Sequence, residues 1–198
     1  MVTNQNNLTP KESLDLIRSM IDKTKDSVAN DSFYFLLWGW LVFVCCISSF
    51  ILLTYFQYPN HYLVWLLMPI GGIVSGIYGS RQAKIKRVKT FVNDALKYLW
   101  LALGLAFIVL VIVNAINHHS NNQMLTYYIL LHAIGTFVSG KMLQFRPLVI
   151  GGLINFALVI VSIHFDNEYQ LLIGGLAVLT SYIIPGHLLR IKSQKLKS

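Results

Sequence analysis

The side chains that could do chemistry in this chain are few. Among 198 residues there are six histidines, two cysteines and eight carboxylates. The carboxylates lie in the first 31 residues and at Asp94, Asp166 and Glu168, outside every long apolar run. Carboxylates inside such runs are the usual mark of proton relays and ion-coupled transport. Their absence argues against a carboxylate-based proton transporter and against paired-carboxylate catalysis.

Other reactive patterns are missing from the sequence as well. It contains no Ser/His/Asp set, no phosphate-binding glycine loop and no metalloprotease helix motif. Cys45 and Cys46 are adjacent, so they lack the spacing of metal ligands, and we interpret them as small apolar packing residues. We therefore predict a protein that is not an enzyme and has no cofactor.

One histidine, His132, lies within a long apolar run, about nine residues from its outer end. At about 1.5 Å per helical residue this is roughly 13 Å deep. Asn155 is similarly central in the next apolar run, so it is a candidate hydrogen-bond partner, and the two are predicted to form a polar site. A neutral histidine bonded to the helix backbone or to Asn155 is one reading. A ligand site, or an axial ligand for haem, is the other.

A second set of polar side chains gathers in the connections on the opposite side from the basic loops. Imidazoles and carboxylates together suit a divalent transition metal such as zinc, copper or nickel. No two of these residues lie four positions apart within one predicted helix, as helical ligands do, and the adjacent histidines can equally form a solvated turn. The candidate external metal site comprises His61, His118, His119, His164, Asp166 and Glu168.

The elements that would position these residues are apolar helices. The chain is 55% hydrophobic and 12% charged, whereas about a quarter of the residues of soluble domains are charged. Crossing the hydrocarbon takes about 20 apolar residues in a helix, and the apolar runs here are continuous rather than alternating. We predict an all-α membrane protein with six transmembrane helices, at residues 33–56, 62–79, 95–116, 124–143, 147–165 and 169–189.

Lysine and arginine set the predicted orientation, because they are retained on the cytoplasmic side. They occur in the amino-terminal segment, in the 80–90 loop, at Lys141 and Arg146, and in the tail. The connections 57–60, 117–123 and 166–168 have none. We predict a bacterial inner-membrane protein with both termini in the cytoplasm. The net charge of +8 is explained by this anchoring, so we expect the bilayer rather than nucleic acid as the partner.

An amphipathic helix is predicted ahead of the first span. Thr9-Pro10 followed by Glu12 is a helix-opening pattern, and apolar residues then recur near one face from Leu14 to Val28. This helix either lies on the membrane surface or the inner face of the bundle, or docks a cytosolic or membrane protein through residues 8–29. The predicted divisions are 1–31 for the cytoplasmic helix, 32–190 for the bundle and 191–198 for a basic tail.

An internal repeat connects the second and fourth spans. Residues 66–76 and 130–140 are identical at seven of eleven positions, and Ile184-Pro185-Gly186 is a weaker echo in the sixth span. We infer three hairpins inserted in the same orientation. Small residues let membrane helices approach closely, so spans two and four are predicted to be central, and a homo-oligomer is left open. The predicted packing residues are Gly71, Gly72, Ser75, Gly76, Gly135, Ser139 and Gly140.

Three strings resemble those of small, uncharacterised bacterial six-helix membrane proteins: residues 32–40, 65–72 and 182–186. The three-hairpin plan is also similar to that of the HdeD-type acid-resistance membrane proteins. Neither resemblance implies an activity or the role of any residue.

The functional hypothesis is a non-enzymatic sensor, regulator or assembly partner that acts through its amino-terminal helix. The alternative is a small solute transporter or channel with a path near His132 and Asn155. A transporter needs a polar cavity at mid-depth, whereas a scaffold can be dry throughout.

Overall fold

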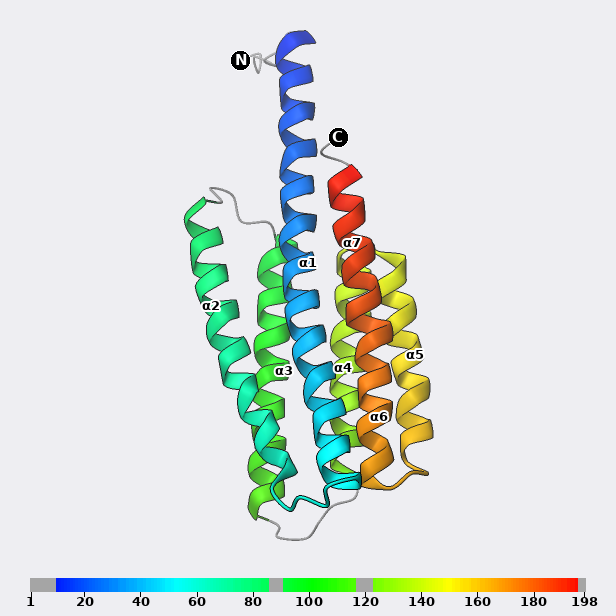
Figure 1. Cartoon of the computed structure of the whole chain (residues 1–198). Coiled ribbons are helices and arrows are strands. Elements are labelled where there is room, and N and C mark those ends of the chain that lie inside the picture. Colours follow the sequence, from blue (N-terminus) through cyan, green and yellow to red (C-terminus); the bar gives the residue numbers. More distant parts are fainter. Residues whose placement is uncertain (1–9, 86–90, 117–122, 196–198) are drawn as a thin grey trace, which may run out of the picture.

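The computed structural model describes residues 10–85, 91–116 and 123–195, and every regular element within these ranges is a helix (Figure 1). The elements are α1 (Pro10–Thr54), the 3-10 helix η1 (His61–Leu67), α2 (Met68–Ile85), α3 (Phe91–Ile116), α4 (Met124–Met142), α5 (Arg146–Ser162), α6 (Asn167–Val178), the π-helix η2 (Leu179–Ile183) and α7 (Ile184–Lys195). The all-α prediction is confirmed.

Four helical stretches are long and apolar enough to cross a membrane: Ser32–Thr54, His61–Arg81, Asp94–Ile116 and Asn167–Ile191. Helix α5 is apolar but has only 17 residues, close to the shortest length that spans the hydrocarbon. Helix α4 has 19 residues, but its histidine and hydroxyl side chains make it less apolar. The chain is thus a membrane protein in which four of the six predicted spans have the expected length and apolarity.

The first helix is longer than predicted. It starts at Pro10, the predicted first helical position, and continues without interruption to Thr54. The proposed division near residue 31 is therefore not a break in the helix, because no proline or glycine lies between Pro10 and Gly39 to end it. At the other end α7 continues to Lys195, so most of the predicted basic tail is also helical.

Two prolines explain the irregular helical segments. Proline has no N–H and its ring crowds the carbonyl four residues earlier. Upstream of Pro69 the chain forms the 3-10 helix η1, and upstream of Pro185 it forms the π-helix η2. Side chains of α1 bind the η1 backbone, since Ser49 Oγ donates to the His61 carbonyl at 3.4 Å and Cys45 Sγ to the Val64 carbonyl at 3.5 Å.

Helix α1 packs against α6, η2 and α7, while α4 packs against α5, α3, α6 and η2 (Figure 1). Within the described residues the backbone of α2 comes close only to α1 and η1, and that of α3 only to α4. One side chain of α3, Trp100, also reaches Tyr182 of η2, with ring centroids 5.9 Å apart. The prediction that span two is central is therefore wrong. Its Gly72 and Gly76 face open space, so this glycine ridge packs against nothing within the described chain.

Candidate functional site around His132

His132 lies in a cage of aromatic rings contributed by two other elements, α3 and η2. The ring centroid of Tyr182 on η2 lies 5.2 Å from that of His132, that of Phe107 on α3 lies at 5.4 Å, and that of Trp100 on α3 lies at 6.5 Å. Tyr182 in turn packs on Phe35 of α1, with ring centroids 5.4 Å apart. The site therefore joins α4 to three separate parts of the bundle.

The imidazole of His132 has a local hydrogen-bond partner. It is bonded to the backbone of Tyr128, one turn earlier in α4. A haem iron would need an accessible ring nitrogen and a flat slot beside it, and the surrounding rings of Trp100, Phe107 and Tyr182 occupy that space. The geometry fits a neutral histidine within an aromatic core better than it fits an axial ligand.

Three buried polar side chains near this cage lack hydrogen-bond partners among the described residues. These are the hydroxyls of Thr136 and Tyr182 and the amide of Asn155. The Thr136 and Tyr182 hydroxyls are neighbours, but their geometry is too poor for a hydrogen bond. Thr136 and Asn155 are 0% exposed. In a membrane such groups usually bind another helix, a water molecule or a ligand.

Helices α4 and α5 pack closely enough to place Asn155. A Cβ on Gly152 would lie 2.7 Å from the Phe137 nitrogen, and Thr126 Oγ1 lies 2.8 Å from Ser162 Oγ. Because the helices run antiparallel, this register places Asn155 level with Ala133, next in sequence to His132. The two predicted polar residues thus lie at similar depth. Of the two partners considered for His132, the structure has the helix backbone and not Asn155, because neither amide atom of Asn155 is bonded.

The sequence repeat corresponds to matching contacts in two helix pairs. In the first pair, Trp38 Nε1 on α1 donates to Ser75 Oγ on α2 at 3.0 Å. One turn away, a Cβ on Gly71 would lie 2.5 Å from Leu41 Cδ2. The two helices approach closely because Gly71 has no side chain, and the Trp38–Ser75 hydrogen bond fixes their register.

The second pair repeats this arrangement. Trp100 Nε1 on α3 donates to Ser139 Oγ on α4 at 3.2 Å, and a Cβ on Gly135 would lie 2.6 Å from Leu103 Cδ1. Each pair therefore combines Trp-x-x-Leu on its first helix with Gly-x-x-x-Ser on its second. The predicted packing residue Gly140 has a different neighbour, because its Cβ would lie 2.6 Å from the Val149 nitrogen of α5.

The predicted external metal site is only partly described. His118 and His119 lie outside the described residues. In the described part of the chain, no group of three or more histidine, cysteine or carboxylate side chains could hold a metal. His164 Nδ1, just beyond the end of α5, lies 3.1 Å from the carbonyl of Ile160 in the last turn of that helix. A metal site using all six candidates, with Asp166 and Glu168 among them, stays a prediction.

Sequence reasoning found His132 but not the residues around it. Trp100, Phe107, Thr136 and Tyr182 come from positions that composition alone assigns to ordinary packing or to the membrane interface. The aligned repeat could have revealed one of them, because Ser75 and Ser139 occupy equivalent positions. Each has a tryptophan partner on the preceding helix. Comparisons with family models, curated proteins and solved structures give no match.

Proposed function

We propose that this chain is a six-span protein of the bacterial inner membrane, built from three like-oriented hairpins with both termini in the cytoplasm. The matching Trp–Ser contacts of the α1–α2 and α3–α4 pairs support the hairpin plan. Both described ends of the chain lie at the same end of the bundle (Figure 1), as the orientation requires. Lys141, in the last turn of α4, and Arg146, the first residue of α5, lie where these two helices join at that same end (Figure 1), which agrees with retention of basic residues in the cytoplasm.

We further propose that this membrane protein is a non-enzymatic sensor, regulator or assembly partner. The observation that carries the proposal is the continuity of α1, which has 45 residues, of which the span Ser32–Thr54 is only about half. At about 1.5 Å per residue the helix is roughly 68 Å long, more than twice the ~30 Å hydrocarbon thickness. Figure 1 shows α1 extending beyond the other helices, which does not fit a helix lying flat on the membrane.

The span of α1 packs closely on the last span, against both η2 and α7. A Cβ on Gly39 would lie 3.0 Å from Ile183 Cγ1, and a Cβ on Gly186 would lie 3.1 Å from Leu36 Cδ2. Since α1 continues through this interface without a break, a protein bound to residues 10–31 would act on the bundle through a rigid helix. The same rigid connection would let a change in the bundle alter how residues 10–31 are presented.

Site-specific photo-crosslinking in cells tests this proposal. A photoreactive amino acid at Ile17 or Ile21, on the apolar face by helical spacing, is expected to give a discrete crosslinked protein band. Ser19 and Lys23, about half a turn round the same helix, are the matched control positions and are expected to give little product. Equal crosslinking at all four positions, or crosslinks to lipid alone, would contradict a protein-docking role.

A small transporter or channel is the second candidate, and the unpaired hydroxyls and amide of Thr136, Tyr182 and Asn155 favour it. Such groups line polar pathways in membrane proteins. Against it, aromatic rings surround His132.

Proteoliposomes separate the two candidates. For a regulator, osmotic water and glycerol permeability should equal that of empty liposomes. Permeability above this baseline that is lost in both Asn155→Leu and His132→Leu, with folding intact by circular dichroism, would make the transporter the better description.

A further inference from the structure

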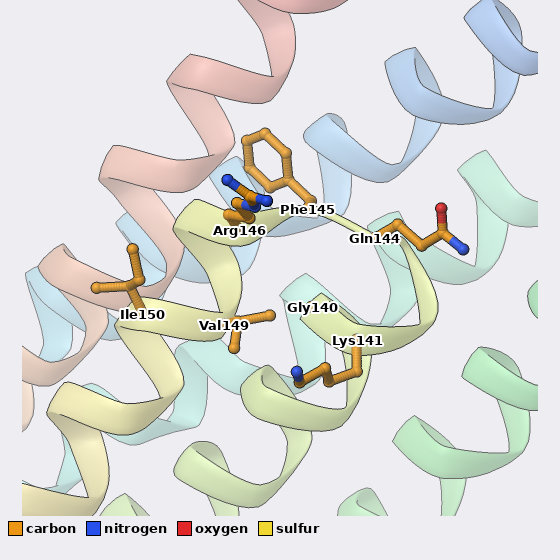
Figure 2. Close-up of a pocket in the computed structure, with 7 residues that line it drawn as sticks. All are labelled: Gly140, Lys141, Gln144, Phe145, Arg146, Val149 and Ile150. Carbon is orange, nitrogen blue, oxygen red and sulfur yellow. The ribbon is translucent and has the colours of Figure 1, made fainter.

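A small cavity lies where α4 ends and α5 begins. Its volume is about 390 Å³, and Figure 2 shows that its lining comes from the last turn of α4, the connecting turn and the first turn of α5. The lining residues are Gly140, Lys141, Gln144, Phe145, Arg146, Val149 and Ile150. Two of the seven are cationic and none is acidic, so the cavity favours an anion.

No carboxylate neutralises these two cations within the part of the chain whose side chains are described. Lys141 and Arg146 are both exposed, and the nearest aromatic contact of Lys141 is the Phe137 ring, 5.9 Å from Nζ. Asp166 and Glu168 lie beyond the far end of α5, about 17 helical residues away. The positive charge at this turn is thus available to a ligand.

The backbone of the turn adds to this preference. Helix α5 begins after Phe145, whose ring cannot cap the helix, so its positive end is not occupied by a side-chain oxygen. Free carbonyls at the end of α4 would repel an anion, but backbone N–H groups of the turn donate hydrogen bonds to them. Leu143, Gln144 and Phe145 donate backbone hydrogen bonds to the carbonyls of Ser139, Lys141 and Gly140 at 2.9, 3.2 and 3.0 Å.

The turn is also rigid enough to be a preformed site. A Cβ on Gly140 would lie 2.6 Å from the Val149 nitrogen, so the two helices touch at the backbone. Gln144 has φ 51°, the left-handed conformation that closes the α4 terminus. Phe145 is 8% exposed and packs into the main core cluster, which fixes the position of the basic residues on either side.

The apolar part of the lining indicates what carries the anion. Ile150 is 56% exposed and, with the half-buried Val149 at the contact between α4 and α5, continues from the cations along α5. An acyl chain can lie along these side chains while its phosphate meets the two cations. We propose that this turn binds an anionic phospholipid, with the phosphodiester held by Lys141 and Arg146 and one acyl chain packed along Val149 and Ile150.

Native mass spectrometry of the full-length protein, titrated in neutral detergent, tests the assignment. Phosphatidylglycerol is expected to stay bound where phosphatidylcholine does not. The variant Lys141→Gln/Arg146→Gln is expected to bind it about twenty-five-fold more weakly, since each basic side chain close to the lipid phosphate contributes a factor of about five. The matched control Lys97→Gln/Arg190→Gln removes the same charge from exposed positions at the same end and should retain affinity.

Three other results of these measurements would contradict the lipid site. Equal loss in the pocket and control variants would show only general surface charge and would overturn the site. Protection of the wild type from thermal unfolding by inorganic phosphate, to the same extent as by phosphatidylglycerol, would show a free-phosphate site instead. The charge-conserving swap Lys141→Arg/Arg146→Lys, expected to fold and to bind the lipid, keeps the test decisive if the neutral variant fails to fold; loss of binding in this folded swap would overturn the proposal.

Discussion

Two glycines of the α4–α5 interface lie where no side chain fits. A Cβ on Gly140 would lie 2.6 Å from the Val149 nitrogen, and one on Gly152 would lie 2.7 Å from the Phe137 nitrogen. In both cases the obstacle is backbone, which cannot rotate away as a side chain can. The close approach of these helices therefore depends on the absence of a single methyl group at each position.

We expect Gly140→Ala and Gly152→Ala each to lower the free energy of unfolding by about 1–3 kcal/mol, because overpacking forces the helices apart. Gly72→Ala is the matched control on α2, where a Cβ meets nothing within 4 Å. It should be neutral or slightly stabilising, because alanine favours helix more than glycine does. Thermal unfolding in detergent micelles, followed by circular dichroism, measures all three.

A stable Gly152→Ala protein would contradict the register of α4 and α5. A destabilised Gly72→Ala protein would have a different meaning, because nothing in the described chain covers that residue. It would indicate that another helix packs there, as in the homo-oligomer that the sequence leaves open.

His132 illustrates what could be predicted at the scale of single residues. Its depth followed from counting along an apolar run, and the structure places Asn155 at a similar depth. The aromatic cage did not follow, because Trp100 and Tyr182 are 32 and 50 positions away in the sequence. Only packing of α3 and η2 on α4 brings these rings together, and an apolar segment in lipid gives little indication of which face meets a neighbour.

At the scale of elements, the presence of the apolar helices and several of their boundaries followed from hydropathy, whereas the 3-10 helix η1 and the π-helix η2 were not predicted. The predicted segment 124–143 matches α4 (Met124–Met142), and 147–165 is close to α5 (Arg146–Ser162). The continuity of α1 was missed because the change from a polar to an apolar pattern near residue 31 was taken as a helix boundary. Hydropathy changes there, but nothing in the backbone chemistry ends the helix.

The two Trp–Ser hydrogen bonds make a prediction about helix pairs. We expect Trp100→Phe and Ser139→Ala each to destabilise the protein. A double-mutant cycle should give a coupling energy of about 0.6 kcal/mol, typical of hydrogen bonds between membrane helices. Trp38→Phe and Ser75→Ala should give a coupling of the same sign and similar size, since the geometry is repeated. Unfolding in mixed micelles, titrated with a denaturing detergent, provides the four free energies for each cycle.

The cross-combination supplies the control for these cycles. Trp38→Phe with Ser139→Ala joins residues from different helix pairs and should be additive, with no coupling beyond experimental error. Coupling in the cross-combination, or additivity within both native pairs, would mean that the two contacts do not act as separate, equivalent units.

At the scale of the whole molecule, the order of packing could not be predicted from sequence. Small residues indicated that span two is central, yet α2 lies at the edge and contacts only α1 and η1 within the described chain. In a soluble protein an apolar helix face indicates that the face is buried against another element. In a membrane protein it does not, because faces that contact lipid, such as those of α2 and α3, are as apolar as the core. Large exposed side chains such as Ile73 and Ile108, at 62% and 58%, are therefore compatible with a surface facing acyl chains.

The predicted orientation tests the whole molecule at once, because successive connections must lie alternately on the two sides of the membrane. In a background with Cys45→Ala and Cys46→Ala, single cysteines at the exposed positions Asn60 and Asp166 should react with a membrane-impermeant maleimide in intact bacterial cells whose outer membrane has been permeabilised. Cysteines at the exposed positions Gln144 and Arg190 should react only after the inner membrane is opened. Asn60, Gln144 and Asp166 lie outside the apolar stretches, and Arg190 is the exposed, next-to-last residue of the stretch Asn167–Ile191, so differences in labelling report the side of the membrane and not burial. Labelling of Gln144→Cys in unopened cells would place the connection between α4 and α5 on the outer side of the membrane, opposite to the prediction. Because α4 also packs on α3 and α6, the six-span, like-oriented arrangement could not survive that result.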